Sequence, residues 1–171
     1  DAVGGADTDY DVVISVTDGI DSDQCTMVFT VLNTEAFCVS LDQTDKTDPA
    51  GGSLQGHQVE VCINFEAGSN EVGGFDFLID YDNSALSFVG ATEGNIYPDY
   101  EWEYFTYRFG PNGNCSGGCP SGMLRVIGIA EANDGMHHPN NVKLVAGDQF
   151  ACLTFLVSND RNLECQFVPI R

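Results

Sequence analysis

Carboxylates are the most abundant side chains in this sequence that could do chemistry. The chain has 26 acidic and 6 basic residues, which gives a formal net charge of −20 at pH 7. Asp18, Asp21 and Asp23 crowd one predicted turn. Closely spaced carboxylates in a loop are ligands for calcium, a hard cation that prefers oxygen. These aspartates are therefore candidate ligands of a structural calcium ion, and the alternative is a solvated acidic surface that keeps a secreted protein in solution.

Cysteine is the second reactive residue type, with seven copies at positions 25, 38, 62, 115, 119, 152 and 165. The sequence has no CxxC pair of the kind that binds zinc, so we predict disulfides and an oxidising compartment. Cys115 and Cys119 flank a flexible Ser-Gly-Gly segment, which favours a local bridge between them. A second bridge is predicted from Cys62 to either Cys152 or Cys165. The odd count leaves one thiol unpaired or paired outside the chain.

Aromatic residues form a dense cluster that includes Tyr100, Trp102, Tyr104 and Tyr107. Aromatic side chains at alternate positions of a strand can stack on sugar rings or anchor a protein contact. Packing in the core is the alternative for several of them. We predict an interaction face here, for protein first and for polysaccharide second.

No pattern in the sequence indicates an enzyme. Neither a nucleophile with a histidine and an acid nor a phosphate-binding glycine motif is present. His137 and His138 precede Pro139 in a predicted loop without an obvious ligand partner. The acidic net charge disfavours nucleic acid and anionic membrane surfaces, and no apolar run reaches bilayer length, so membrane insertion is not expected.

These side chains must be positioned by β-strands, because apolar residues alternate with polar ones and no dozen residues keep helical spacing. The predicted strands are 10–16, 25–32, 37–41, 59–65, 73–82, 86–91, 102–109, 123–130, 150–157 and 166–170. The first two form a hairpin. The others, separated by Gly, Asn, Asp and Pro, predict an all-β fold in which two sheets form a sandwich.

The run that begins at Val59, VEVCINFEAGSNEVGGFDFLIDYDNSALSFVGATEG, resembles the cohesin module, as do the later segments GMLRVIGIAE and GDQFACLTFLVSND. The resemblance covers about residues 37–171. It implies a nine-stranded jelly-roll β-sandwich, extracellular display and binding to protein, typically to a calcium-loaded dockerin. The cysteine content and the insert at 102–121 depart from typical cellulosomal cohesins, and resemble cohesin-type modules of long bacterial surface proteins.

Residues 10–33 resemble the last two strands of an immunoglobulin-like bacterial surface repeat. We therefore divide the chain into an N-terminal β-hairpin extension at 1–34, a partial repeat or donor of strands, and a cohesin-like sandwich at 35–171. The hairpin has apolar residues at Val12, Ile14, Phe29 and Val31. A lone hairpin is marginal in water, so we expect it to be covered by a neighbour.

These observations together predict an extracellular or cell-surface module that binds protein. The expected partners are copies of itself or neighbouring modules in a surface assembly or filament, joined by strand complementation. The alternative is a carbohydrate-binding module that uses Trp102, Tyr104 and Tyr107. No cofactor is expected apart from the candidate calcium ion.

Overall fold

The fold of the protein is given by a computed structural model, which describes residues 8–17, 22–31, 37–44, 52–68, 70–111, 113–115, 119–132 and 142–171. The chain forms two compact units, Asp1–Phe37 and Cys38–Arg171.

The first unit is a two-stranded antiparallel hairpin of β1 (Thr8–Thr17) and β2 (Ser22–Val31). Its register places Val12 opposite Met27. The side chains of Val13 and Val28 are 54% and 59% exposed, so this hairpin leaves apolar surface uncovered. The side chains of the four residues predicted for strand exchange lie outside the described part of the structure, and that role stays a prediction: Val12, Ile14, Phe29 and Val31.

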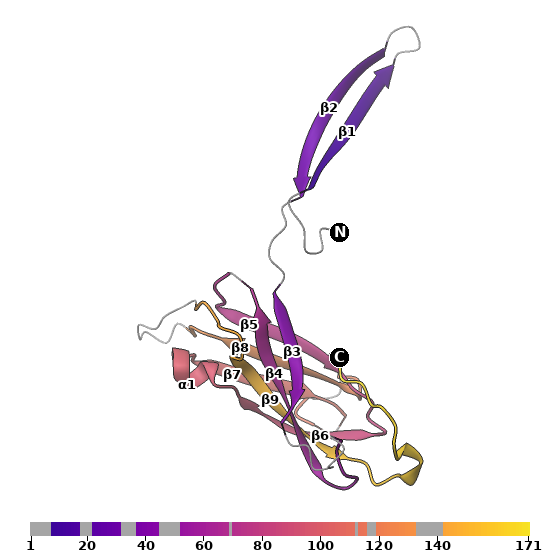
Figure 1. Ribbon diagram of the computed structural model, residues 1–171, viewed down its shortest axis with the longest axis vertical. Helices are drawn as coiled ribbons and strands as arrows, with labels where there is room; N and C mark the ends of the chain where they lie inside the picture. The colour runs from indigo at the N-terminus through magenta and orange to yellow at the C-terminus, as the bar shows by residue number, and fades with distance from the viewer. Residues whose placement is uncertain are drawn as a thin grey trace. The chain divides into compact units, whose positions relative to one another are not determined.

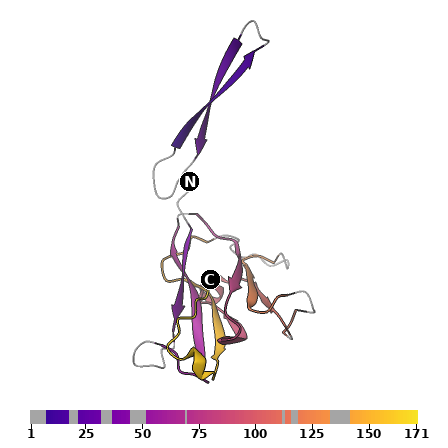
Figure 2. The same ribbon diagram turned by 90° about the vertical axis from the view of Figure 1, so that its right-hand side faces the viewer.

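The second unit is a sandwich of two antiparallel sheets, which the two views of Figures 1 and 2 show as separate layers. One sheet has the strand order β3 (Cys38–Gln43), β4 (Gln58–Ala67), β9 (Gln149–Val157) and β6 (Leu86–Glu93). The other has the order β5 (Gly74–Asp80), β8 (Met123–Ile129) and β7 (Tyr104–Phe109). The predicted all-β sandwich is confirmed. Within the described part of this unit seven strands are present, compared with nine in the pattern that the family resemblance implies.

The core lies between the sheets and follows the alternation that the sequence predicted. On β4 the inward side chains are those of Val59, Val61, Ile63 and Phe65, and each is at most 8% exposed. On β5, Phe75 and Ile79 are buried while Leu78 between them points outward and is 63% exposed. Alternation places every second side chain of a strand on the same face, so a two-residue period was enough to identify the core side of these strands.

Strand β9 departs from simple alternation at its start. Ile63 pairs with Ala151 and Asn64 with Gln149, so the β4–β9 register skips Phe150, which forms a bulge. Phe150 and Ala151 are consequently both fully buried. The Phe150 ring packs edge-on against Phe75 and Phe77, with centroids 5.1 and 5.4 Å away. The bulge therefore adds one more aromatic ring to the contact between the two sheets.

The described residues also contain two short helices, and the sequence predicted neither. Helix α1 (Ile96–Tyr100) connects β6 to β7 and buries Ile96 and Tyr97, and the 3-10 helix η1 (Arg161–Leu163) follows β9. A helix of five residues is too short to show a helical period.

The prediction of a strand at 166–170 is wrong except at the end of this segment. In the described structure these residues form one strand-type pairing, an isolated bridge between Ile170 and Tyr81. Phe167 is 90% exposed, because the segment leaves η1 through a turn before it reaches the edge of β5.

Adjacent residues of β9 offer a matched test of the two-layer arrangement. Phe155 is fully buried and its ring contacts Tyr81 and Phe88, whereas Leu156 is 41% exposed. We predict that Phe155→Ala lowers the free energy of unfolding by about 3–5 kcal/mol, and that Leu156→Ala lowers it by less than about 1 kcal/mol. Urea unfolding monitored by circular dichroism measures both. Equal losses would contradict the assignment of these two faces.

Candidate functional site

The outer face of the three-stranded sheet, called here the β5–β8–β7 face, carries exposed apolar side chains. Leu78, Tyr104 and Ile129 are 63%, 44% and 40% exposed. They share this face because the register pairs Leu78 with Arg125 and Tyr104 with Ile129. The outward positions of the three strands are Asp76, Leu78, Asp80, Met123, Arg125, Ile127, Ile129, Tyr104, Thr106 and Arg108.

The same face carries two of the chain's six basic residues, Arg108 and Arg125. They lie directly opposite each other on β7 and β8. Arg125 forms an ion pair with Asp76, whose Oδ1 accepts a hydrogen bond from Arg125 Nε at 2.8 Å. This hydrogen bond and the positive charge hold the pKa of the Asp76 carboxyl below its usual value. In a chain of net charge −20, the β5–β8–β7 face is thus a local exception, because its two arginines balance the outward carboxylates of Asp76 and Asp80. It can accept apolar groups, and an acidic group at Arg108.

The β5 edge of this sheet is partly open. At one end Val72 exchanges main-chain hydrogen bonds with Val142, at 2.8 and 3.1 Å, and at the other Asp80 exchanges them with Arg171, at 2.8 and 3.0 Å. The main-chain groups of alternate residues point to the same side of a strand, so those of Asp76 and Leu78 point to this edge as well. No strand in the described ranges pairs with them, because β5 ends the sheet order.

The opposite edge, at β7, is blocked by a side chain. Asn114 Nδ2 donates a hydrogen bond to Tyr107 O at 2.6 Å, and Asn114 Oδ1 accepts one from Phe109 N at 3.0 Å. The amide thus imitates one residue of a neighbouring strand. Such blocking is a known defence against edge-to-edge association. Nothing in the local sequence predicted this contact, because it depends on how the loop after β7 folds back.

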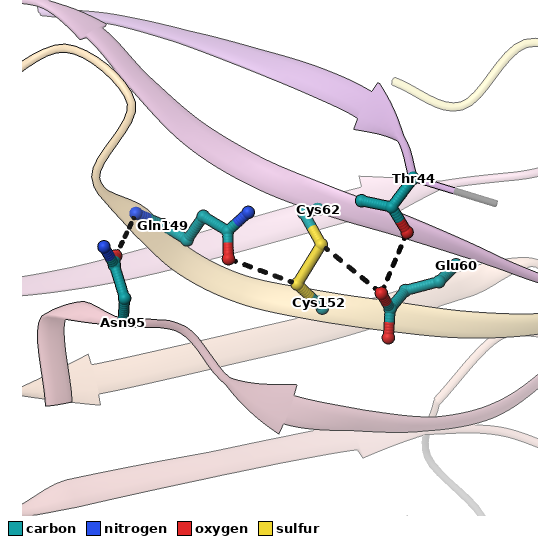
Figure 3. Close-up of a disulfide and its surroundings, with 6 residues drawn as sticks. All are labelled: Thr44, Glu60, Cys62, Asn95, Gln149 and Cys152. Carbon is teal, nitrogen blue, oxygen red and sulfur yellow. Dashed lines mark hydrogen bonds between the residues drawn. A yellow bond between two sulfur atoms is a disulfide. The ribbon is translucent and has the colours of Figure 1, made fainter. Parts of the chain in front are cut away.

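The outer face of the four-stranded sheet carries a disulfide between neighbouring strands (Figure 3). Cys62 on β4 lies directly opposite Cys152 on β9, with their Cα atoms 4.0 Å apart, and the two are bridged. Of the two partners that the sequence left open for Cys62, the structure pairs it with Cys152. A second disulfide joins Cys115 to Cys119. The predicted alternative role of Cys165 is wrong, because this residue lies in the exposed turn after η1 and carries a free thiol.

The predicted aromatic interaction face is also wrong as a single surface. Trp102 is only 6% exposed and stacks on Phe75, with ring centroids 6.0 Å apart. Tyr107 points inward, where its ring packs edge-on against Phe88 at 5.6 Å. Tyr100 belongs to a short helix and donates a hydrogen bond to Asp148 Oδ2 at 2.8 Å, which raises the pKa of its hydroxyl. Among the four predicted residues, Tyr104 is the one on the β5–β8–β7 face.

These rings separate because the segment is not one continuous strand. Helix α1 ends at Tyr100, and the next residue, Glu101, has a φ of 59° that turns the chain before Trp102. The hydroxyl of Tyr97, buried below this turn, donates a hydrogen bond to Tyr104 O at 3.2 Å. Burial raises the pKa of Tyr97 well above its usual value. A carbohydrate platform that requires Trp102, Tyr104 and Tyr107 side by side is therefore not formed.

The side chains predicted as calcium ligands lie outside the described residues: Asp18 and Asp21 fall outside entirely, and of Asp23 only the backbone is described. The predicted surface loop at His137 and His138 falls outside them as well. Calcium binding at the three aspartates stays a prediction. Within the described ranges, one group of His, Cys, Asp and Glu side chains has the spacing of a metal site, and it consists of Glu60, Cys62 and Cys152. No helix in the described part is long and apolar enough to cross a membrane.

Comparison with known proteins points to one family. A family model described as cohesin domain matches residues 45–162. The structure is similar to the OlpA cohesin of Clostridium thermocellum, solved in complex with the dockerin Doc918, at 16% identity and a TM-score of 0.53 over 78% of this chain and 80% of that one. It is also similar to the second type II cohesin module of the ScaA scaffoldin of Acetivibrio cellulolyticus, at 12% identity and a TM-score of 0.50 over 80% and 75% of the two chains. No curated protein sequence matches.

The ion pair between Arg125 and Asp76 on the β5–β8–β7 face makes the stability of the fold depend on pH. Because the pKa of Asp76 is lowered in the folded state, this carboxyl contributes stability above its unfolded-state pKa, and the contribution is lost as the pH falls through the folded-state value. We predict that Arg125→Gln raises the pKa of Asp76 toward its usual value, whereas Arg108→Gln changes it less. NMR titration of the side-chain carboxyl measures both. An Asp76 pKa that does not respond to Arg125→Gln would refute the pairing.

Proposed function

The chain belongs to the cohesin domain family, and on this basis we propose that it is a non-catalytic, protein-binding module of an extracellular assembly. The observation that carries the proposal is the β5–β8–β7 face, where exposed Leu78, Tyr104 and Ile129 surround a pair of arginines. Exposed apolar groups next to arginine and tyrosine are the usual composition of a protein contact. The two disulfides support a location outside the cell.

The partner that best fits this surface is a calcium-loaded dockerin. The OlpA cohesin, which is similar in fold, was solved with a dockerin bound. A sheet face provides a flat platform on which a helical partner can place apolar side chains, while Arg108, next to the Arg125–Asp76 ion pair, can pair with its carboxylates. The acidic remainder of the surface would repel an acidic partner elsewhere, so the arginines also favour one orientation of docking.

Two exposed leucines on opposite sheets test the proposed surface. We predict that Leu78→Asp weakens binding of a calcium-loaded dockerin about tenfold or more, since a buried apolar contact is replaced by an unpaired charge. Leu156→Asp, on the outer face of the four-stranded sheet, should change the dissociation constant less than about twofold. Isothermal titration calorimetry against a panel of dockerins measures both. Equal affinity of the Leu78→Asp variant would reject this face, and no binding to any dockerin would reject the partner class.

We further propose that modules of this type join through strand complementation. The open part of the β5 edge, at Asp76 and Leu78, can accept a strand, and the β1–β2 hairpin exposes apolar side chains such as Val13 and Val28. Addition of the hairpin of one copy to the β5 edge of another would extend the three-stranded sheet and cover that apolar surface. A contact of this head-to-tail kind propagates from copy to copy and leads to a filament where its rotation does not close a ring.

Removal of the hairpin tests strand complementation. We predict that a chain reduced to residues 38–171, which contains the whole of the second unit, stays folded and monomeric where the full chain assembles as its concentration rises. Leu78→Pro, which removes one main-chain donor from the β5 edge, should reduce assembly of the full chain. Sedimentation velocity across a concentration series measures both. Assembly of the shortened chain would show that the hairpin is not the donor.

A further inference from the structure

The Cys62–Cys152 disulfide lies within a compact set of metal-ligating atoms on the four-stranded sheet. The Sγ atoms of Cys62 and Cys152 and a carboxylate oxygen of Glu60 all lie within 4.8 Å of one another. All three residues come from β4 and β9, the two inner strands of the sheet. Although both cysteines point away from the core, Cys62 is only 1% exposed and Cys152 only 8%. The two sulfur atoms are therefore held on paired strands and shielded from water, whereas Glu60 is half-buried.

Polar neighbours orient the donor atoms on both sides of the disulfide (Figure 3). Glu60 Oε1 lies 3.9 Å from Cys62 Sγ and accepts a hydrogen bond from Thr44 Oγ1 at 2.9 Å. On the other side Gln149 Oε1 lies 3.8 Å from Cys152 Sγ. A hydrogen bond to a ligand from a second residue is the usual way in which a protein fixes a metal-binding carboxylate.

We propose that Glu60, Cys62 and Cys152 form a binding site for a thiophilic divalent cation, Zn²⁺ or Cd²⁺, which the disulfide closes and a dithiol reductant opens. This site is independent of the proposed protein-binding function, since it lies on the other sheet. Two thiolates and one carboxylate make a donor set suited to zinc. The fourth position is available to Gln149 Oε1 or to water.

The reaction that opens the site is a thiol–disulfide exchange. A thiolate of the dithiol attacks one sulfur of the bridge, the S–S bond breaks, and the second thiol of the reductant displaces the remaining cysteine. The bridge gains two electrons and two protons, while the reductant becomes a cyclic disulfide. The cation then binds both cysteines as thiolates, and their two protons pass to solvent.

The geometry suits a single cation. Zinc binds thiolate sulfur at about 2.3 Å and carboxylate oxygen at about 2.0–2.2 Å, so neighbouring ligands of a tetrahedral site lie about 3.5–3.8 Å apart. Once the S–S bond is broken, small side-chain rotations bring the three donors to this spacing from their present separations of less than 4.8 Å. The net charge of −20 raises the local concentration of divalent cations. The bound cation would replace the covalent bond as the cross-link between β4 and β9.

The test uses a full-length chain in which Cys25, Cys38, Cys115, Cys119 and Cys165 are replaced by Ser. After reduction, one equivalent of Zn²⁺ should bind and raise the melting temperature by several degrees, and Cd²⁺ should produce a thiolate charge-transfer absorbance. The oxidised chain should show neither effect. Glu60→Gln should weaken zinc binding about tenfold or more, whereas Glu66→Gln, on the same face of the same strand, should leave it unchanged.

A second measurement covers the case in which this variant does not fold. In the reduced wild-type chain, Zn²⁺ should protect Cys62 and Cys152 from alkylation by iodoacetamide, while the exposed Cys38 and Cys165 still react. Mass mapping identifies the alkylated residues. Because both cysteines are buried, labelling runs until the zinc-free chain is alkylated at both of them. Equal alkylation at that time with zinc present would overturn the proposal, as would a zinc-dependent melting temperature that persists after Cys62→Ser and Cys152→Ser.

Discussion

The pairing of β4 with β9 is the constraint on which the rest of the second unit depends. These strands occupy the middle of the four-stranded sheet, and β9 also pairs with β6. On the inner side their register aligns Val61 with Leu153, both in the core, and on the outer side the same register aligns Cys62 with Cys152. Because a shift by one residue would exchange the two faces, the core and the disulfide enforce the same register. Each therefore stabilises the other.

The outer faces of the two sheets differ in chemical character, and the two proposed binding sites lie on different faces for this reason. The four-stranded sheet turns Glu60 and Glu66 outward together with the bridged cysteines. The β5–β8–β7 face turns apolar side chains and two arginines outward. A single acidic chain thus has one surface suited to protein and another suited to a cation, and the sandwich separates them.

The two edges of the three-stranded sheet, β5 and β7, differ in how far their main-chain groups are covered. At β7 the amide of Asn114 occupies the main-chain groups of Tyr107 and Phe109, while within the described ranges the outer edge of β5 is paired only near its two ends. In a protein that avoided all edge association we would expect both edges to be blocked. The asymmetry supports a directional contact at β5.

The sequence by itself determined most of the strands and the core sides of β4 and β5, because a two-residue period is a local property that tertiary packing did not override there. It did not exclude a strand at 166–170, where the structure has only an isolated bridge. It also predicted a bridge between Cys115 and Cys119, which are four positions apart. Only the tertiary structure decided the partner of Cys62, since the cysteines at 62 and 152 are 90 positions apart and their meeting depends on the β4–β9 register. It likewise decided the burial of Trp102. The turn at Glu101, directly after α1, separates Tyr100 from Trp102, two residues that alternation alone would have placed on one face.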